Sequence, residues 1–141
     1  MNASPSETAT PPAGQEEPLI SVVLPTYNEL ENIVPLVSEI LARTAEAGYR
    51  VQVVVVDDNS QDGTQEALQK AFGQNQRLKL VVRQHERGLA TALWQGINEA
   101  QGQVVVIMDS DFNHHPRDLV RVLGALPSRL VIGSRYVPGE V

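Results

Sequence analysis

The sequence Arg50-Val-Gln-Val-Val-Val-Val-Asp-Asp58 contains the segment that decides the fold. Residues 51–56 are β-branched with one exception, and β-branched residues favour strands. A run of this kind, without alternation of apolar and polar residues, is typical of a parallel strand whose sheet is covered on both faces. We therefore predict a strand over residues 51–56, within a mainly parallel sheet of an α/β fold.

Short strands and helices alternate on both sides of this segment, in the pattern of βα units around one sheet. Strands are predicted at residues 20–24, 51–56, 78–82, 104–108 and 130–132. Helices are predicted between Asn32 and Gly48 and at residues 64–72, 89–100 and 116–126. Pro25 is expected to close the first strand, and Asn32 to be the N-cap of the first helix.

Helical spacing also predicts which side chains are buried. One face of the first helix would consist of Leu30, Ile33, Val34, Val37, Ile40 and Leu41. In the third helix, Trp94 stands at helical spacing with Ala90, Leu93 and Ile97 and is predicted to lie in the core.

The composition bounds the chemistry. With 141 residues, 42% of them hydrophobic, the chain has the size of one soluble domain. It has no cysteine, which excludes disulfides, thiolate zinc sites and a cysteine nucleophile. Any metal must therefore bind to oxygen or imidazole ligands.

The charge is acidic, with 11 Lys and Arg against 17 Asp and Glu, a net charge of −6. Because there is no basic run, we expect no nucleic-acid partner. Residues 1–18 have no Lys or Arg, contain Glu7, Glu16 and Glu17, and are expected to be a disordered tail before a domain at 19–141. We predict neither a signal peptide nor a transmembrane segment, and a cytoplasmic protein.

Polar residues follow the predicted strands, where open α/β sheets bind their ligands. The candidates are Pro25, Tyr27 and Glu29 after the first strand, Asp57 and Asp58 after the second, Asp109, Ser110, Asp111 and Asn113 after the fourth, and Arg135 after the fifth. Carboxylates crowded at one edge repel one another unless a cation or hydrogen-bond donors offset the repulsion. Asp109 and Asp111 can both turn toward one ion, and oxygen ligands suit Mg²⁺ or Mn²⁺.

Each candidate also has a purely structural interpretation. Asp109 can cap a turn while Asp111 is solvated, and Asp57 and Asp58 can be ordinary loop and cap residues. Tyr27 can pack on the sheet edge instead of stacking near a base. His114 and His115 can bind a metal, or they can cap a helix or pack against it. Arg87 and Arg135 can bind a diphosphate, or they can be surface charges.

Five segments together carry a resemblance to a known family. They are Ser21-Val-Val-Leu-Pro-Thr-Tyr-Asn-Glu29, Val56-Asp-Asp-Asn-Ser-Gln-Asp-Gly-Thr64, Gly88-Leu-Ala-Thr-Ala92, Met108-Asp-Ser-Asp-Phe-Asn-His-His-Pro116 and Gly133-Ser-Arg-Tyr136. In their order and spacing, over nearly all of residues 19–139, the chain resembles family 2 glycosyltransferases of the GT-A fold. Within that family it is most similar to the dolichyl- or polyprenyl-phosphate mannose synthases.

The resemblance implies a three-layer, Rossmann-like sandwich and the inverting transfer of a sugar, typically mannose from GDP-mannose, to a polyprenyl phosphate at a membrane surface. It also implies the role of each candidate. Pro25, Tyr27 and Glu29 would contact the nucleotide, Asp57 or Asp58 would hold the base and ribose, Asp109 and Asp111 would bind metal and diphosphate beside Ser110, and Arg135 would face a phosphate. Asn113 stands where relatives often carry Gln or Ser on the metal side.

The implied chemistry needs little from a general base. The leaving group is a nucleoside diphosphate, so catalysis depends on neutralising its charge, which a metal ion can do. The acceptor phosphate is already an anion, so it need not lose a proton to attack.

Members of this family continue well past the Gly-Ser-Arg-Tyr segment, whereas this chain stops at Val141. We therefore expect the N-terminal part of the domain, with much of the donor site, and an acceptor site that is absent or supplied by a partner chain. A catalytically silent nucleotide-sugar binder is one alternative. A phospho-receiver domain and a phosphatase with Asp109 as nucleophile and Asp111 as acid are others; both normally have their acidic pair after the first strand.

Overall fold

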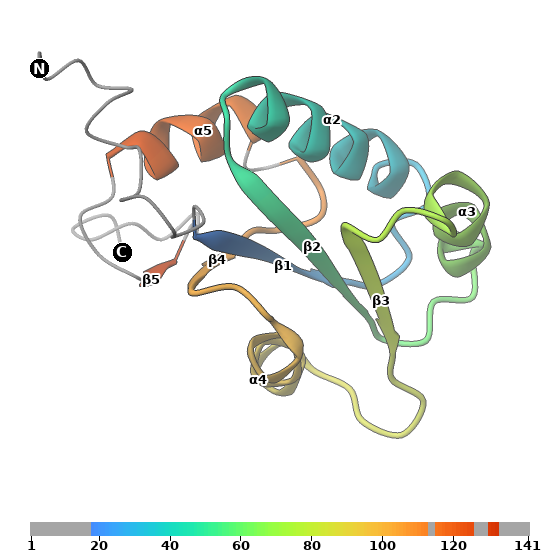
Figure 1. The fold of residues 1–141 in the computed structure, drawn as a ribbon. Coiled ribbons are helices and arrows are strands. Elements are labelled where there is room, and N and C mark those ends of the chain that lie inside the picture. Colours follow the sequence, from blue (N-terminus) through green and yellow to red (C-terminus); the bar gives the residue numbers. More distant parts are fainter. Residues whose placement is uncertain (1–17, 113–114, 126–129, 133–141) are drawn as a thin grey trace, which may run out of the picture.

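A computed structural model describes residues 18–112, 115–125 and 130–132, in which strands and helices alternate (Figure 1). The strands are β1 (Leu19–Thr26), β2 (Arg50–Asp57), β3 (Leu78–Val82), β4 (Val104–Ile107) and β5 (Leu130–Ile132). The helices are α2 (Ile33–Glu46), α3 (Thr64–Phe72), α4 (Leu89–Glu99) and α5 (Pro116–Gly124). The predicted tail, and the candidates Asn113, His114 and Arg135, lie outside the described residues.

The five strands form one sheet in the order β3-β2-β1-β4-β5, and every pairing is parallel. The chain adds β2 and β3 on one side of β1, then crosses to the other side and adds β4 and β5. Between β1 and β4 the direction of winding reverses, and ligands of open α/β sheets bind at such a point. The predicted parallel α/β fold is confirmed.

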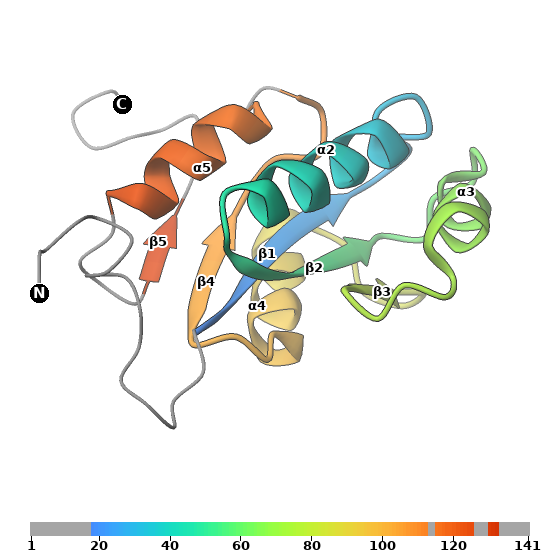
Figure 2. The same cartoon turned by 45° about the horizontal axis from the view of Figure 1, so that its top comes forward.

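Helices cover both faces of the sheet, so the molecule has three layers. Helices α2, α3 and α5 lie on one face and α4 lies on the other (Figures 1 and 2). Strand β2 explains this arrangement: Val53 and Val55 belong to the core under α2, and Val54 and Val56 to the core under α4. The interpretation of residues 51–56 as a strand buried on both faces is therefore correct.

Helix α4 approaches the sheet through its smallest residues. Ala92 and Gly96 are its buried positions, and a Cβ on Gly96 would collide with the side chain of Val23 and make a tight contact with that of Val56. This close approach overturns the prediction for Trp94, which is 66% exposed on the outer side of the helix. The apolar spacing of residues 90, 93, 94 and 97 is real, but the sheet selects the face that lets the two backbones come close.

Two further predictions need correction. Leu30 precedes α2 and is exposed, because the chain turns at Glu29, whose carbonyl accepts hydrogen bonds from the amides of Asn32 and Ile33. Strand β1 does not end at Pro25 but runs to Thr26. Val23 bonds toward β4, so Pro25, two residues on, faces the same side, and β4 has ended there. Pro25 has no N–H to donate to β4, and the pairing with β4 ends at Val23, whereas the pairing with β2 continues through Pro25 to Thr26.

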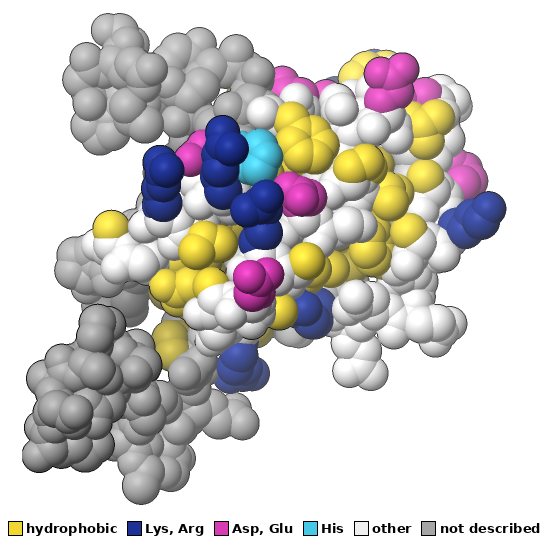
Figure 3. Space-filling view, turned by 90° about the horizontal axis from the view of Figure 1, so that it is seen from above, with side chains coloured by type: hydrophobic (Ala, Val, Ile, Leu, Met, Phe, Trp, Pro, Cys, Tyr) yellow, Lys and Arg dark blue, Asp and Glu magenta, His cyan; other side chains and the backbone are white. Residues whose placement is uncertain are grey.

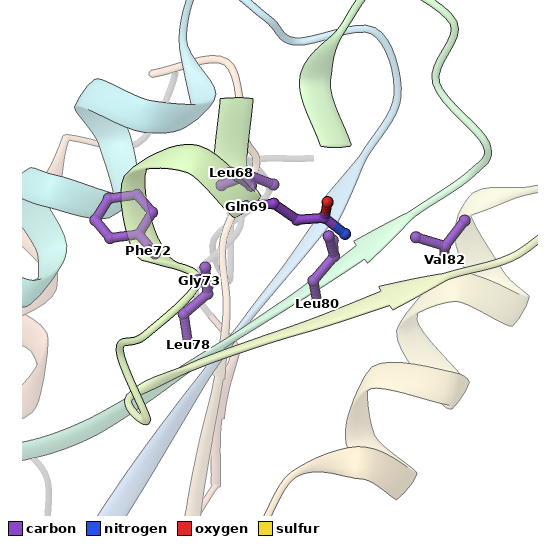
Figure 4. Close-up of a pocket in the computed structure, with 7 residues that line it drawn as sticks. All are labelled: Leu68, Gln69, Phe72, Gly73, Leu78, Leu80 and Val82. Atoms are coloured by element: carbon purple, nitrogen blue, oxygen red, sulfur yellow. The ribbon is translucent and has the colours of Figure 1, made fainter. Parts of the chain in front are cut away.

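At the edge strand β3, an apolar groove of about 250 Å³ runs beneath α3 (Figure 4). It is lined by Leu68, Gln69, Phe72, Gly73, Leu78, Leu80 and Val82. The groove offers no titratable side chain. Among the described residues, no helix is long and apolar enough to cross a membrane.

Candidate functional site

The candidate residues gather because the strands are parallel and end at the same edge of the sheet. Along this edge follow the ends of β3, β2, β1 and β4, in that order. Arg83 follows β3, and Tyr27 follows β1. Asp57 is the last residue of β2 and Asp58 comes directly after it, while Asp109 to Asp111 follow β4.

Asp57 ties its own loop together. Its side chain is fully buried. One carboxylate oxygen accepts from the Ser60 hydroxyl at 2.6 Å, and the other from the Ser60 amide and the Gln65 side chain, both at 2.8 Å. With three protein donors and no exposed surface, Asp57 holds the loop after β2 and has no face to offer a ligand.

Asp58 instead points toward the end of β3. Its Oδ1 accepts from Arg83 Nε at 2.6 Å and its Oδ2 from the Gly88 amide at 3.1 Å. The Arg83 guanidinium also donates to the carbonyl of Gly88 at 2.9 Å and to the Thr91 hydroxyl at 2.8 Å. Asp58 therefore joins the ends of β2 and β3 to the start of α4.

Arg83 was not predicted from the sequence, where it is one arginine after an apolar strand. It is only 5% exposed, which requires a charged partner. The hydrogen bond and charge of Asp58 raise the pKa of Arg83 above its usual value, against the opposing effect of burial. The sequence feature that could have pointed to Arg83 is its position directly after a strand, shortly before a helix with a glycine N-cap.

The loops after β1 and β2 are hydrogen-bonded to each other. The Asn28 amide donates to Ser60 Oγ at 2.7 Å, and the Gln61 amide donates to Asn28 Oδ1 at 3.0 Å. Asn28 and Asn59 have φ values of 51° and 58°, in the left-handed region that asparagine tolerates. Beside them an open, polar hollow of about 340 Å³ is lined by Asn59, Ser60, Gln61, Gly63, Gln65 and Glu66.

Asp62 fixes the same loop to the start of α2 and α3. It accepts from the Leu30 amide at 3.1 Å and from the amide and hydroxyl of Thr64. Desolvation raises the pKa of Asp62, but these hydrogen bonds outweigh it and lower the pKa below the usual value.

Ser110 joins β1 to the loop after β4. Its buried hydroxyl donates to the Pro25 carbonyl at 3.0 Å, on the side of β1 where β4 has ended. This bond crosses the point where the winding of the sheet reverses. It fixes the position of the Asp109–Asp111 segment relative to the loop after β1, which carries Tyr27 and Glu29.

Asp109 and Asp111 flank Ser110 and are both partly exposed. The chain turns sharply after them, at Phe112 with a φ of 66°. In the part of the chain that the structure describes, no three or more His, Asp or Glu side chains are grouped to hold a metal ion. Two carboxylates separated by a single residue still fit a hard cation that takes its other ligands from a bound diphosphate or from water.

Tyr27 and Glu29 lie in the loop after β1. The Tyr27 ring is 49% exposed, and the Arg87 guanidinium carbon lies 4.9 Å from its centroid. Glu29 accepts a hydrogen bond from the Asn32 side chain at 3.0 Å, which shapes the turn into α2.

His115 has the structural role that the sequence offered as its alternative. Its Nδ1 accepts from the Arg117 amide at 3.1 Å and so caps α5.

On the surface of α2 and α5, basic and acidic side chains are interspersed (Figure 3).

The comparison with protein families decides what these segments belong to. The model described as "Glycosyl transferase family 2" matches residues 21–141. The chain belongs to this family. Its α/β fold is that of the GT-A glycosyltransferases, as the resemblance implied.

Curated members of the family match most of this chain. A dolichol-phosphate mannosyltransferase of Saccharomyces cerevisiae is 37% identical over 121 residues, which are 84% of this chain and 45% of the yeast protein. One of Pyrococcus furiosus is 41% identical over 122 residues, 85% of this chain and 34% of that protein. The chain thus spans less than half the length of these relatives.

Solved glycosyltransferase structures agree with the fold. A mannosyltransferase of Pyrobaculum calidifontis, in complex with GDP-Man and Mn²⁺, superposes with a TM-score of 0.65 and 32% identity over 79% of this chain and 33% of that one. A glucosyl-3-phosphoglycerate synthase of Mycobacterium tuberculosis, solved with Mn²⁺ and UDP, has a TM-score of 0.64 and 26% identity over 88% of this chain and 44% of that one.

The family and the strand order together argue against a phospho-receiver domain. Receiver domains have the strand order 2-1-3-4-5, whereas this sheet has the order β3-β2-β1-β4-β5. An acidic pair after the fourth strand, in a family 2 glycosyltransferase, also leaves no support for the phosphatase alternative.

Proposed function

We propose that this chain forms the donor site of a metal-dependent, inverting mannosyltransferase that uses GDP-mannose and a polyprenyl or dolichyl phosphate acceptor. Family membership, the names of the curated relatives and a structural neighbour solved with GDP-Man and Mn²⁺ support this proposal.

The observation that carries the proposal is the hydrogen bond from Ser110 to the Pro25 carbonyl. It connects two groups of side chains with different chemistry: Tyr27, Glu29 and Asp58 on one side, and Asp109 and Asp111 on the other. Neighbouring strands lie about 4.8 Å apart, so the ends of β2 and β4 are about 10 Å apart with β1 between them. An extended nucleoside diphosphate can therefore reach from Asp58 to the aspartates after β4.

On the base side we assign Asp58, and not Asp57, to the nucleotide. Asp57 is fully buried and has three protein donors, while the Asp58 side chain is 14% exposed. Pro25 would contribute its ring at the switch point and Ser110 would line the diphosphate side.

Asp109 and Asp111 would hold Mg²⁺ or Mn²⁺, with Asn113 as a further ligand. A bound divalent cation supplies Lewis-acid stabilisation of the negative charge on the leaving diphosphate. The two aspartates would position the cation next to the diphosphate, and the positive charge of the cation would balance their own negative charges. Arg135 would face the diphosphate or the acceptor phosphate.

The acceptor phosphate needs no base from the protein, so attack on the anomeric carbon opposite the diphosphate would invert its configuration. A polyprenyl phosphate resides in a membrane, so we propose that the transfer takes place at a membrane surface. Because the relatives are more than twice as long, we propose that residues beyond those in this chain, or a partner chain, complete the acceptor site.

The proposal is tested by titrating GDP-mannose into the Asp111→Ala variant with and without Mn²⁺, using calorimetry. We expect the variant to lose the metal dependence of binding that the wild-type chain has. Asp118→Ala, on the exposed surface of α5, is the control and should bind as the wild type does. Equal metal dependence in Asp111→Ala and wild type would contradict the assignment of Asp111 as a metal ligand. The alternative, a catalytically silent binder, would bind the donor without supporting transfer.

A further inference from the structure

The loop between β3 and α4, residues 83–88, brings Arg87 onto the ring of Tyr27. The distance of 4.9 Å from guanidinium carbon to ring centroid is that of a cation–π contact. Both side chains are exposed, and they come from loops at the ends of different strands. In the order of the sheet, Asp58 at the end of β2 lies between them.

The backbone that carries Tyr27 is fixed on both sides. The Thr26 carbonyl accepts from the Asp58 amide at 2.9 Å. On the other side, the Asn28 amide donates to Ser60 Oγ. The ring therefore projects from a rigid support.

The backbone that carries Arg87 is fixed as well. Asp58 binds both ends of the loop, Arg83 at one and the Gly88 amide at the other. Gly88 has φ 116° and ψ 150°, a conformation that only glycine adopts readily, and its carbonyl accepts from Arg83. The Arg87 side chain can thus swing, while its Cα stays opposite the Tyr27 ring.

We propose that Tyr27 and Arg87 form a clamp that holds the nucleobase of the donor between the aromatic ring and the guanidinium plane, with Asp58 at the edge of the base. This inference rests on the proposed function and adds a residue to it, since Arg87 has no assigned role. Tyrosine rings and arginine planes both stack on nucleobases. In the free protein Arg87 lies on the ring directly; when a base enters, the guanidinium moves outward and stacks on the base instead.

The two other roles open to Arg87 differ in what they require. A phosphate ligand would act through charge, so lysine could replace it and its effect would grow with the number of phosphates. A surface residue without a ligand would have no effect on binding. A clamp requires the flat guanidinium and acts on the base alone.

The test compares the affinities of GMP and GDP for the full 141-residue chain by calorimetry, with Mn²⁺ present throughout. For Arg87→Ala we expect both affinities to fall by the same factor, about 5- to 20-fold, because stacking on one base is lost in both complexes. Arg87→Lys should lose most of the same factor. Tyr27→Leu should weaken the binding of both nucleotides as well, because the face of the aromatic ring is what stacks on the base.

The outcomes separate this inference from the proposed function. If the wild type binds neither nucleotide, the proposed function and the clamp fail together. If the wild type binds and Arg87→Ala binds equally well, the clamp alone fails. If the loss is larger for GDP than for GMP and Arg87→Lys restores it, Arg87 is a phosphate ligand and the clamp is wrong. All three variants change exposed side chains, so unchanged melting temperatures should accompany each result.

Discussion

At the residue scale, two adjacent aspartates at the end of β2 have separate tasks. Asp57 is saturated by its own loop, whereas Asp58 neutralises the buried Arg83 and anchors the β3–α4 loop. The sequence offered the two as equivalent candidates. Only the direction in which each side chain leaves the end of the strand distinguishes them.

Removing the charge of Asp58 should destabilise the fold. Asp58→Asn leaves the Arg83 guanidinium buried without a countercharge, and we expect the free energy of unfolding to fall by about 3 kcal/mol. Urea denaturation measures this change. Asp118→Asn removes the charge from an exposed pair with Arg121 and should cost less than about 0.5 kcal/mol. Equal costs for the two variants would contradict the account of Asp58.

Asp62 should make stability depend on pH. Its pKa in the folded state lies below the value of 3.8 for an unperturbed aspartate. The carboxylate therefore stabilises the fold above pH 3.8, and this contribution is lost as the pH falls through the lower, folded-state pKa. The difference in unfolding free energy between wild type and Asp62→Asn should be largest near neutral pH and shrink below pH 3.8. A difference that grows on acidification would have the wrong sign.

At the scale of elements, the sequence predicts the strands and helices well and their contact faces less well. The Val-rich run of β2 and the Gly- and Asp-containing turns act locally, so the order and type of elements follow from short segments. Leu30 was misassigned because the chain turns at Glu29, before α2 begins, and Trp94 because a different face of α4 packs on the sheet. Strand β1 continues past Pro25 because it still pairs with β2 there, which no local pattern reveals.

A second feature of the elements also lies beyond local sequence. Helix α5 packs in the same layer as α2, although the chain moves in the opposite direction along the sheet from β4 to β5. The β4–α5–β5 connection therefore has the opposite hand to the three before it, and such crossovers are rare. A rule based on the usual hand would have put α5 on the face of α4.

The close contact between α4 and the sheet gives a sharp test. Gly96→Ala adds a methyl group against Val23 and Val56, and we expect a net loss of about 1–2 kcal/mol after the gain in helix propensity. Gly124→Ala is the matched control in α5, where the added Cβ meets only the Tyr49 hydroxyl at ordinary contact distance. That substitution should be neutral or stabilise by up to about 1 kcal/mol. Thermal or urea unfolding of the two variants decides; equal effects would show that α4 does not lie as close as described.

At the scale of the whole molecule, the parallel sheet brings the loops after β1, β2, β3 and β4 to one edge. The sequence predicted this edge because motifs at the ends of parallel strands must converge, and the structure confirms the convergence for the ends of β1, β2 and β4. Arg83 escaped prediction because its importance comes from burial beside Asp58. The roles of Asn113 and Arg135 stay predictions, since both lie outside the described residues.

The whole-molecule charge also gains an explanation. A chain with a net charge of −6 can hold a nucleoside diphosphate when a cation lies between the aspartates and the phosphates. The acidic edge would then be a requirement of donor binding and no obstacle to it.

The central claim, a nucleotide-sugar site that depends on a divalent cation, is tested most directly by calorimetry of the wild-type chain with GDP-mannose at increasing Mn²⁺, with EDTA as the metal-free reference. The account predicts no measurable binding in EDTA and an affinity that rises with Mn²⁺ until the metal saturates, with Mg²⁺ able to substitute. Absence of binding to GDP-mannose at every concentration of either metal would contradict it.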